Sequence, residues 1–331
     1  MESTVDPNEQ GSLAEDTAAT GMQYRLRRGA AEAVVVGLAG ALRTYRVAGE
    51  DFTEPYGEDE IPPAGNGIQM TPWPNRVADA RWALDGQTQQ LDVTEPSRGH
   101  ASHGLLRNTQ LMLESKTGTG VVLRGEIHPQ HGWPFRMTHR VSYALEECGA
   151  LTVSQTLTNH SARPAPAALG NHPFLRVGDV PSDELTLAVD AGRWIEADER
   201  LIPVAARDAA ATDMDFRQGR RVGADPLDVC LTGLTPGEGG RHEARLMAPD
   251  GRTLTLWSDP VFAYTHVFVT DRLPGRDTAV AVEPMTAPAD ALNSGEGLHW
   301  LEPGQNLTGS WGLIPPAAEN PAATDERTTR R

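Results

Sequence analysis

Cysteine and long apolar runs are scarce in this chain of 331 residues. Its two cysteines, Cys148 and Cys230, lie far apart without metal-type spacing, so we expect reduced, buried thiols in a cytoplasmic protein. No apolar run approaches the roughly 18 residues of a membrane-spanning helix, and none is predicted. The opening residues, MESTVDPNEQ, lack the basic and apolar regions of a signal peptide, and none is predicted.

Basic residues are outnumbered, with 29 Lys and Arg against 45 Asp and Glu, and the formal net charge is −16 at pH 7. Such a balance disfavours binding to nucleic acid through a basic surface. It suits a neutral small molecule and argues mildly against a polyanionic substrate. We therefore expect a small-molecule partner, with no nucleic acid and no membrane.

Three familiar signatures of nucleotide binding and catalysis are also missing. The chain contains no G-x-x-x-x-G-K-[ST] phosphate loop and no G-x-G-x-x-G followed by an acidic residue. It also lacks the G-x-S-x-G nucleophile elbow. The function therefore has to be sought in other residues.

Long segments with a helical period are scarce, whereas short apolar runs alternate with many of the 33 glycines and 25 prolines. Examples are residues 33–38, 121–123, 151–157, 185–189, 254–257, 267–270 and 307–311. This pattern predicts an all-β sandwich or barrel. We expect one domain over residues 22–314, flanked by disordered segments at 1–21 and 315–331.

Residues 278–297 form the most informative stretch, because a short β-branched run delivers the carboxylate of Glu283 at its end. Pro284 lacks a backbone donor, so we expect regular strand pairing to stop there. A carboxylate held at a rigid strand end is well placed to act as a base. A solvated glutamate at a strand end is an equally good interpretation of this segment alone.

Two histidines, His103 and His172, lie beside glycine or proline at sharp backbone features. Histidine exchanges protons near neutral pH, although a structural, hydrogen-bonded histidine is the more frequent case. Two histidine pairs are three residues apart, namely His100 with His103 and His128 with His131. On a strand this spacing puts the two rings on opposite faces, so we expect no metal site.

Two further polar residues stand near prolines. Arg76 follows the rigid turn TPWPN and could aim its fork of donors at sugar hydroxyls or a carboxylate. Asp228 follows a proline and precedes a strand-like run, and Asp225 competes with it for the same role. For either residue alone, a surface arginine or a turn aspartate is the simpler interpretation.

Taken together, these segments resemble the aldose 1-epimerase (galactose mutarotase) family. The motifs that carry the resemblance are PWPNRVADARW, SHGLLR, GNHPFLRV, DPLDVCLT and VAVEPMTAPADALNSG, in this order along the chain. Membership would imply a large antiparallel β-sandwich, a sugar substrate, no cofactor, and a monomer or weak homodimer. The expected activity is interconversion of the α and β anomers of a free hexose such as galactose or glucose.

The resemblance also implies residue roles, carried over motif by motif. Glu283 would be the general base and His172 the general acid. His103 would hold and polarise the sugar near its ring oxygen, while Arg76 and Asp228 would bind hydroxyls.

Three other functions remain open at the level of sequence. A hexose-6-phosphate 1-epimerase would need extra basic residues around the pocket, with Arg81, Arg107 and Arg176 as candidates. A glycoside hydrolase could use Glu283 and Asp228 as a carboxylate pair. A non-catalytic sugar-binding protein could share the same fold.

Overall fold

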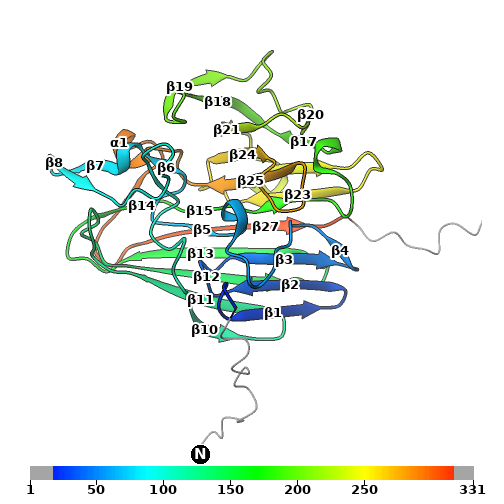
Figure 1. Ribbon diagram of the computed structural model, residues 1–331, viewed down its shortest axis with the longest axis horizontal. Coiled ribbons are helices and arrows are strands. Elements are labelled where there is room, and N and C mark those ends of the chain that lie inside the picture. Colours follow the sequence, from blue (N-terminus) through cyan, green and yellow to red (C-terminus); the bar gives the residue numbers. More distant parts are fainter. Residues whose placement is uncertain (1–17, 317–331) are drawn as a thin grey trace, which may run out of the picture.

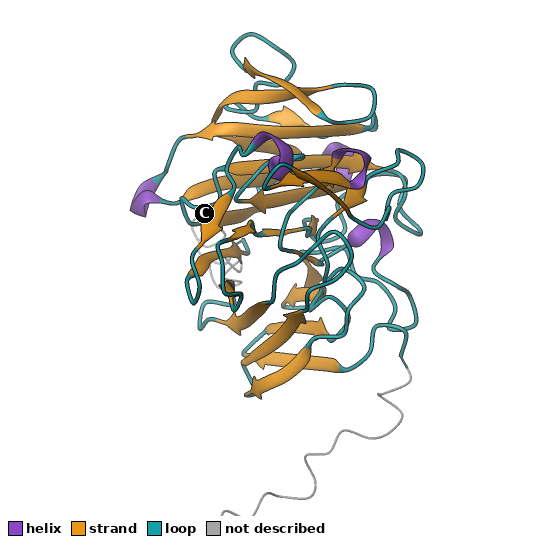
Figure 2. Cartoon of the chain, turned by 90° about the vertical axis from the view of Figure 1, so that its left-hand side faces the viewer, coloured by secondary structure: helices purple, strands orange, loops and turns teal. Residues whose placement is uncertain are grey.

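Short strands joined by tight turns make up most of residues 18–316, the part of the chain that this computed structural model describes (Figure 1). Within it, α1 (Ala291–Ser294) is the only α-helix, so helices are rare in the side view of Figure 2. The predicted disordered segments lie almost wholly outside these residues. Residues 18–21 and 315–316 are the exceptions, and Thr20 donates its hydroxyl to the carbonyl of Glu58 at 2.8 Å.

Two large sheets dominate the structure. The nine-stranded sheet has the spatial order β10 (Met112–Lys116), β11 (Gly120–Ile127), β12 (Met137–Leu145), β13 (Leu151–Asn159), β27 (Asn306–Ile314), β23 (Thr253–Ser258), β22 (His242–Met247), β17 (Thr186–Val189) and β20 (Arg220–Arg221). The eight-stranded sheet has the order β19 (Pro203–Asp208), β18 (Ala191–Ala197), β21 (Leu227–Leu234), β24 (Tyr264–Thr270), β25 (Ala279–Met285), β15 (Gly170–Asn171) and β5 (Gln69–Met70), and β16 (Phe174–Leu175) pairs beside β25.

Smaller elements surround these two sheets. A four-stranded sheet contains β1 (Gln23–Arg28), β2 (Ala31–Val36), β3 (Leu42–Val47) and β4 (Glu50–Asp51). Three two-stranded ribbons pair β6 (Arg76–Val77) with β9 (Ala101–Ser102), β7 (Arg81–Leu84) with β8 (Gln87–Gln90), and β14 (Ala165–Ala167) with β26 (His299–Leu301). Single 3-10 turns occur at Pro63–Gly65, Ala78–Ala80, Ser182–Glu184 and Glu238–Gly240.

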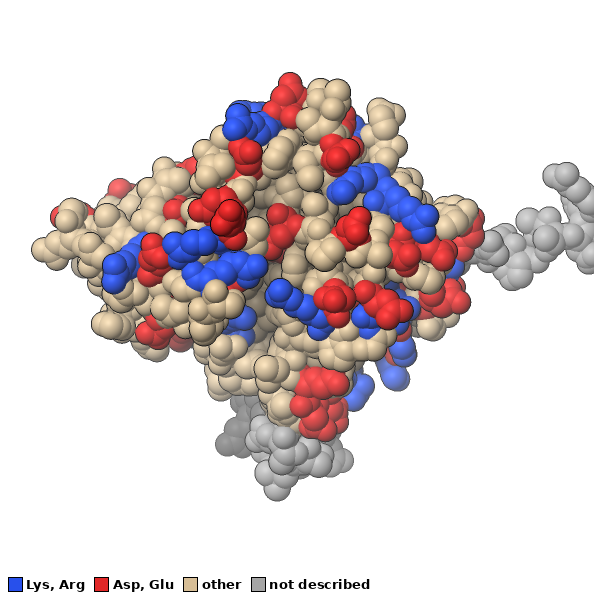
Figure 3. All heavy atoms as spheres, turned by 45° about the horizontal axis from the view of Figure 1, so that its top comes forward, with Lys and Arg blue, Asp and Glu red and all other residues tan. Residues whose placement is uncertain are grey.

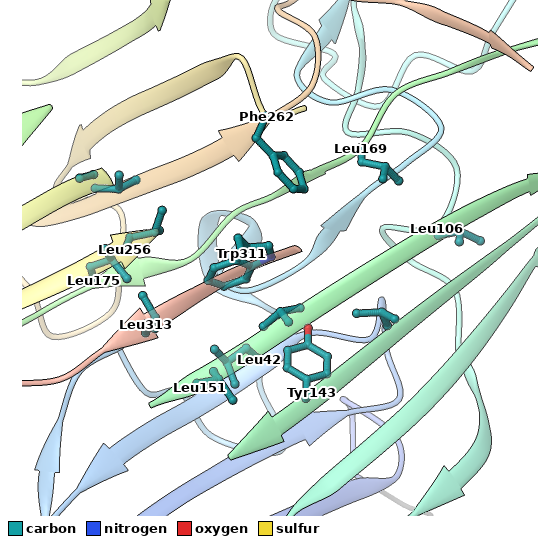
Figure 4. Packing of buried hydrophobic residues seen from close by; sticks show 14 of the residues in the cluster. Leu42, Leu106, Tyr143, Leu151, Leu169, Leu175, Leu256, Phe262, Trp311 and Leu313 are labelled. Atoms are coloured by element: carbon teal, nitrogen blue, oxygen red, sulfur yellow. The ribbon is translucent and has the colours of Figure 1, made fainter. Parts of the chain in front are cut away.

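The core follows from the two-residue period of the strands. In β13, Leu151, Val153 and Leu157 are buried, while the intervening threonines and serine are partly exposed. Leu151 pairs with Leu313 of β27 (Figure 4), within one cluster that also includes side chains of the other large sheet. This shared core, together with the antiparallel strand pairing, confirms the predicted all-β antiparallel sandwich.

Strand β25 is buried along its whole length and carries the candidate base. Val280 and Val282 belong to the large core cluster, whereas Ala279 and Ala281 pack in a separate cluster with Phe174. Alternate residues of a strand point to opposite faces, so Glu283 shares the face of Ala281, away from the main core. The fold thereby places this carboxylate on the face of β25 that points away from the main hydrophobic core.

The expectation that pairing stops at Pro284 is wrong. The ladder with β24 continues through Pro284 to Met285. On the other side of β25, the backbone N–H of Val282 donates to Pro173 and that of Thr286 to Leu169. Pro284, which has no N–H, falls between them, where the facing chain passes from β15 to β16. The proline is tolerated because the facing ladder is already interrupted at that point.

The prediction of two buried thiols is half wrong. Cys230 lies in β21 and is buried, but Cys148 is exposed because it belongs to the turn that joins β12 to β13. Both cysteines are free. No helix within residues 18–316 combines the length and the apolar composition that crossing a membrane would require.

Candidate functional site

A row of side chains across the eight-stranded sheet forms the centre of the site. His266 of β24 pairs directly with Glu283 of β25. On the other flank of β25, Gly170 pairs with Met285 and Phe174 with Ala281. Continuing that register through the interruption sets His172 opposite Glu283, so the carboxylate has a histidine on each side.

His172 and Glu283 are in direct contact. The distance from His172 Nε2 to Glu283 Oε1 is 3.2 Å, and both side chains are almost completely buried. Within the described residues, His172 Nδ1 and Glu283 Oε2 have no hydrogen-bond partner. Buried polar atoms are normally paired, so these two leave hydrogen-bonding capacity for a ligand.

Burial changes the proton affinity of both members of this pair. It raises the pKa of Glu283 to about 7, although the positive charge of His266 opposes the rise. It lowers the pKa of His172 to about 3. Groups this close titrate as a unit, so between these two values the pair holds a single shared proton. Burial favours the uncharged arrangement, with that proton on Glu283.

Beyond His266, charged groups alternate in sign. His266 Nε2 lies 2.9 Å from Asp228 Oδ1, and Asp228 Oδ2 lies 3.4 Å from Arg76 Nη2. Arg76 also donates to Glu95, at 2.8 Å from Nε and 3.4 Å from Nη2. Glu95 in turn accepts from Arg98 at 2.8 Å. This chain of contacts fixes the orientation of each charged side chain before any ligand binds.

The same contacts keep His266 and Asp228 ionised. Burial alone would lower the pKa of His266, but the negative charge of Glu283 and the hydrogen bond to Asp228 outweigh it and raise that pKa to about 10. Burial would raise the pKa of Asp228, but the hydrogen bond to His266 and the charges of His266 and Arg76 hold it well below its usual range. The protonated imidazole of this site is therefore His266.

The third histidine of the site, His103, lies in a strained turn. Its φ is 62°, and Gly104 follows at φ 71°, where an added Cβ would meet the carbonyl oxygen of Thr71 at 2.0 Å. The turn brings the His103 ring to 5.3 Å from the His172 ring, edge to face. Burial, reinforced by the nearby His172, lowers the pKa of His103 well below its usual value. His103 is therefore a neutral hydrogen-bonding group.

These side chains line a cavity of about 250 Å³. The volume lies just below the range of small-molecule pockets, which span about 300–1,000 Å³, and suits a compact ligand. The ring of Phe268 supplies an apolar wall among residues that, apart from Ala64, are polar. Outside the cavity, acidic and basic side chains are interspersed over the face in Figure 3 and form no broad basic surface there.

All five residues singled out from the sequence line this cavity, namely Arg76, His103, His172, Asp228 and Glu283. Asp225, the competitor of Asp228, is exposed and does not line it. The other histidines of the two spaced pairs also lie elsewhere. His100 is buried with its ring nitrogens near Asp79 N and Arg200 O, while His128 and His131 are exposed.

Of the three candidate arginines for a charged sugar, only Arg107 lines the cavity. Arg81 is exposed and donates to Gln90, while Arg176 is buried against Glu54. Arg272, which the sequence did not indicate, joins Arg107 at the cavity wall.

Sequence reasoning missed several lining residues, chiefly His266, Phe268, Asn75 and Glu95. The sequence did contain a signal for His266 and Phe268. Together with Tyr264 they occupy every second position of one strand, so their side chains share one face of it. A histidine on a buried strand needs a hydrogen-bonding partner, because buried polar groups are normally paired. Glu95 carried no comparable signal, since it lies in an irregular segment between β8 and β9.

The described residues contain no group of three or more His, Cys, Asp or Glu side chains arranged to hold a metal ion.

Comparison with known proteins gives one family and several similar folds. The model of the family "Aldose 1-epimerase" matches residues 22–312. The uncharacterized protein YihR of Escherichia coli (strain K12) is 29% identical over 287 residues, covering 86% of this chain and 91% of that protein.

Solved structures agree at the level of the fold. The GalM/aldose epimerase homologue from C. elegans superposes with a TM-score of 0.78 at 18% identity, covering 89% of this chain and 99% of that chain. Galactose 1-epimerase from Lactobacillus acidophilus NCFM gives 0.73 at 16% identity, covering 88% and 94%.

Proposed function

The chain belongs to the aldose 1-epimerase family, and from that premise we propose that it interconverts the α and β anomers of a hexose such as galactose or glucose. The observation that carries the proposal is the contact between His172 and Glu283, two buried proton-exchanging groups 3.2 Å apart at a polar cavity. Anomer interconversion needs one base and one acid acting on neighbouring oxygens, and this pair supplies both.

The proposed reaction moves two protons and breaks one bond. Glu283 takes the proton of the anomeric hydroxyl while His172 gives a proton to the ring oxygen, and the bond between C1 and that oxygen breaks. The open-chain aldehyde turns about its C1–C2 bond. The reverse transfers then close the ring on the other face, so no atom or electron is gained or lost.

The remaining cavity residues hold the sugar during these transfers. His103, as a neutral imidazole near His172, hydrogen-bonds close to the ring oxygen. Arg76 and Asp228 are fixed by their mutual contact and direct their free donors and acceptors at hydroxyl groups. Phe268 packs against the apolar face of the sugar ring.

Polarimetry on freshly dissolved single anomers tests the proposal. The panel contains galactose, glucose, their 6-phosphates and an aryl galactoside, each compared with the spontaneous rate in buffer. We expect faster anomer equilibration for at least one sugar, with no release of the aryl group. Equilibration at the buffer rate for every sugar contradicts the proposal, and aryl release supports a glycoside hydrolase instead.

Arg76→Ala is expected to weaken substrate binding while the protein stays folded. The guanidinium remains charged at any working pH, so it binds substrate and transfers no proton. Loss of a charge-assisted hydrogen bond costs about 1.5–3 kcal/mol, so KM should rise about tenfold or more. Arg98→Ala is the matched control, because Arg98 also contacts Glu95 but does not line this cavity. Unchanged kinetics of Arg76→Ala would remove Arg76 from the binding role.

A second candidate function is favoured by the two arginines that line the cavity without a carboxylate partner. Within residues 18–316, no carboxylate oxygen lies within salt-bridge distance of Arg107 or Arg272. Arg107 is half-buried and its only side-chain hydrogen bond in the described structure goes to the carbonyl of Ser102, at 3.3 Å. Burial lowers its pKa. A cation kept partly out of water without a counter-charge suits a negatively charged ligand, such as a hexose 6-phosphate.

Arg107→Gln distinguishes the two candidate substrates. If the sugar carries a phosphate, KM for the hexose 6-phosphate should rise about tenfold or more, with little change for the free hexose. Arg81→Gln, an exposed arginine outside the cavity, is the control. Equal effects on charged and free sugars, measured by polarimetry, would argue against the phosphorylated substrate.

A further inference from the structure

His266 has no role in the two proton transfers, yet it is the charged residue set directly opposite the proposed base. It pairs with Glu283 across two neighbouring strands, and both line the cavity. Residues directly opposite in an antiparallel pair have their Cβ atoms about 4.5–5.5 Å apart. The imidazole and the carboxylate therefore interact at short range in a site that is shielded from water.

We propose that His266 is a positioning residue that keeps a positive charge beside Glu283 and so favours the ionised form of that carboxylate. The inference rests on the proposed function, because only an ionised Glu283 can take the proton of the anomeric hydroxyl. It adds a third histidine to the chemistry, one that touches no reacting atom and acts through the base.

Two arrangements of the shared proton compete. With the proton on Glu283, both groups are neutral and the site has neither an ionised base nor a charged acid. With the proton on His172, both are charged, which burial disfavours. A positive charge close to Glu283 offsets this by stabilising the carboxylate, and it does so more strongly in a low-dielectric cavity than in water.

The surroundings of His266 explain why its charge persists. Asp228 accepts from Nε2 at 2.9 Å, and Asp228 is itself held by Arg76. Asn75 Nδ2 lies 3.5 Å from Nδ1, while Asn75 Oδ1 accepts from Arg76 Nη1 at 3.2 Å. The elevated pKa of His266, about 10, agrees with this geometry.

Other charged or titratable groups also act on the pair of Glu283 and His266. Asp228 opposes ionisation of Glu283, whereas Arg76 favours it. The Cys230 thiol, paired with His266 across β21 and β24, has a pKa raised by burial and is neutral. The remaining such groups among the cavity residues are His103, Arg107, His172, Glu95 and Arg272. Of the groups on the two strands that flank β25 at Glu283, only His266 is a cation.

His266→Gln tests the proposal, because glutamine can still donate to Asp228 but carries no charge. The primary readout is the titration of the Glu283 carboxyl, followed by carbon-13 NMR in the full chain and assigned with Glu283→Gln. We expect the pKa of Glu283 to rise by at least one pH unit, which is a tenfold change in proton affinity. Turnover at neutral pH should fall about tenfold or more, with a smaller change in KM.

His139→Gln is the control, because His139 is also buried and hydrogen-bonded but lies in β12, outside the cavity. It should leave the titration of Glu283 unchanged.

An unchanged Glu283 titration in His266→Gln overturns the proposal. So does an equal shift in His139→Gln. Since this readout needs no turnover, it stays informative even if the protein proves inactive on every sugar, which would count against the proposed function alone.

Discussion

Glu283→Gln is expected to lower the rate of anomer interconversion by about 10²-fold or more, with a much smaller change in sugar binding. Glutamine keeps the shape of the side chain but cannot take a proton from the anomeric hydroxyl, and a positioned base typically contributes about 10²–10⁴-fold. The measurement is turnover and KM by polarimetry on whichever sugar the parent protein uses. Near-normal interconversion of the anomers by this variant would falsify the assignment of Glu283 as the base.

Thermal unfolding of the same variant separates lost chemistry from lost structure. The folded-state pKa of Glu283 is about 7, above its ordinary value of 4.5, so between these values this carboxyl is more fully protonated in the folded protein than in the unfolded chain. This residue therefore lowers stability progressively as pH rises from about 4.5 to 7, by roughly 3 kcal/mol in total. Relative to the parent, Glu283→Gln should be more stable at pH 8 than at pH 5.

The pH–rate profile of the parent should be bell-shaped, because the active pair holds one proton. Rising pH removes that proton near pH 7, where the carboxyl of Glu283 titrates, and low pH adds a second proton that His172 binds with its depressed pKa. Activity should therefore fall on both sides. Glu283→Gln should lose the limb near pH 7.

His172→Asn is the second variant with a large expected effect, again about 10²-fold or more in turnover. Asparagine keeps a polar group beside Glu283 but supplies no titrating acid for the ring oxygen, and the acidic limb of the pH profile should disappear. The matched control is His100→Asn, because His100 is buried but hydrogen-bonded outside the cavity. Retention of normal turnover in His172→Asn would assign the acid to another group.

The double variant tests whether the two residues work as a unit. Glu283 and His172 take part in the same pair of proton transfers. In a variant that already lacks one of them, removing the other should therefore lower turnover far less than it does in the parent protein. The rate of the double variant should thus lie close to that of the slower single variant. Fully multiplicative losses would indicate that the two residues act in separate steps.

The sequence was informative about the fold because both sheets obey simple local rules. The alternation of Leu151, Val153 and Leu157 indicates a strand without any knowledge of its neighbours. Pro284 shows the limit of such rules. Whether a missing N–H ends a strand depends on which neighbour the nitrogen faces, and that neighbour, the chain around Asn171, is far away in the sequence.

Residues of the site that lie in recognisable motifs could be predicted from the sequence. Residues that reach the site only through the register of strand pairing could not. Glu283, His172 and His103 stood beside prolines or glycines, and the structure brings them to one cavity. His266 lies in an ordinary strand with no motif around it. Its place opposite Glu283 follows from the pairing of β24 with β25, which no local pattern specifies.

The two segments that flank Glu283 in the sheet lie at very different distances from it along the chain. The hairpin of β24 and β25 is local, so its loop closure costs little entropy, and His266 can meet Glu283 early in folding. The flank that carries His172 comes from a segment far earlier in the chain, and such long-range contacts form slowly. We therefore expect regain of catalysis on refolding, followed by polarimetry, to lag behind regain of β-structure by circular dichroism.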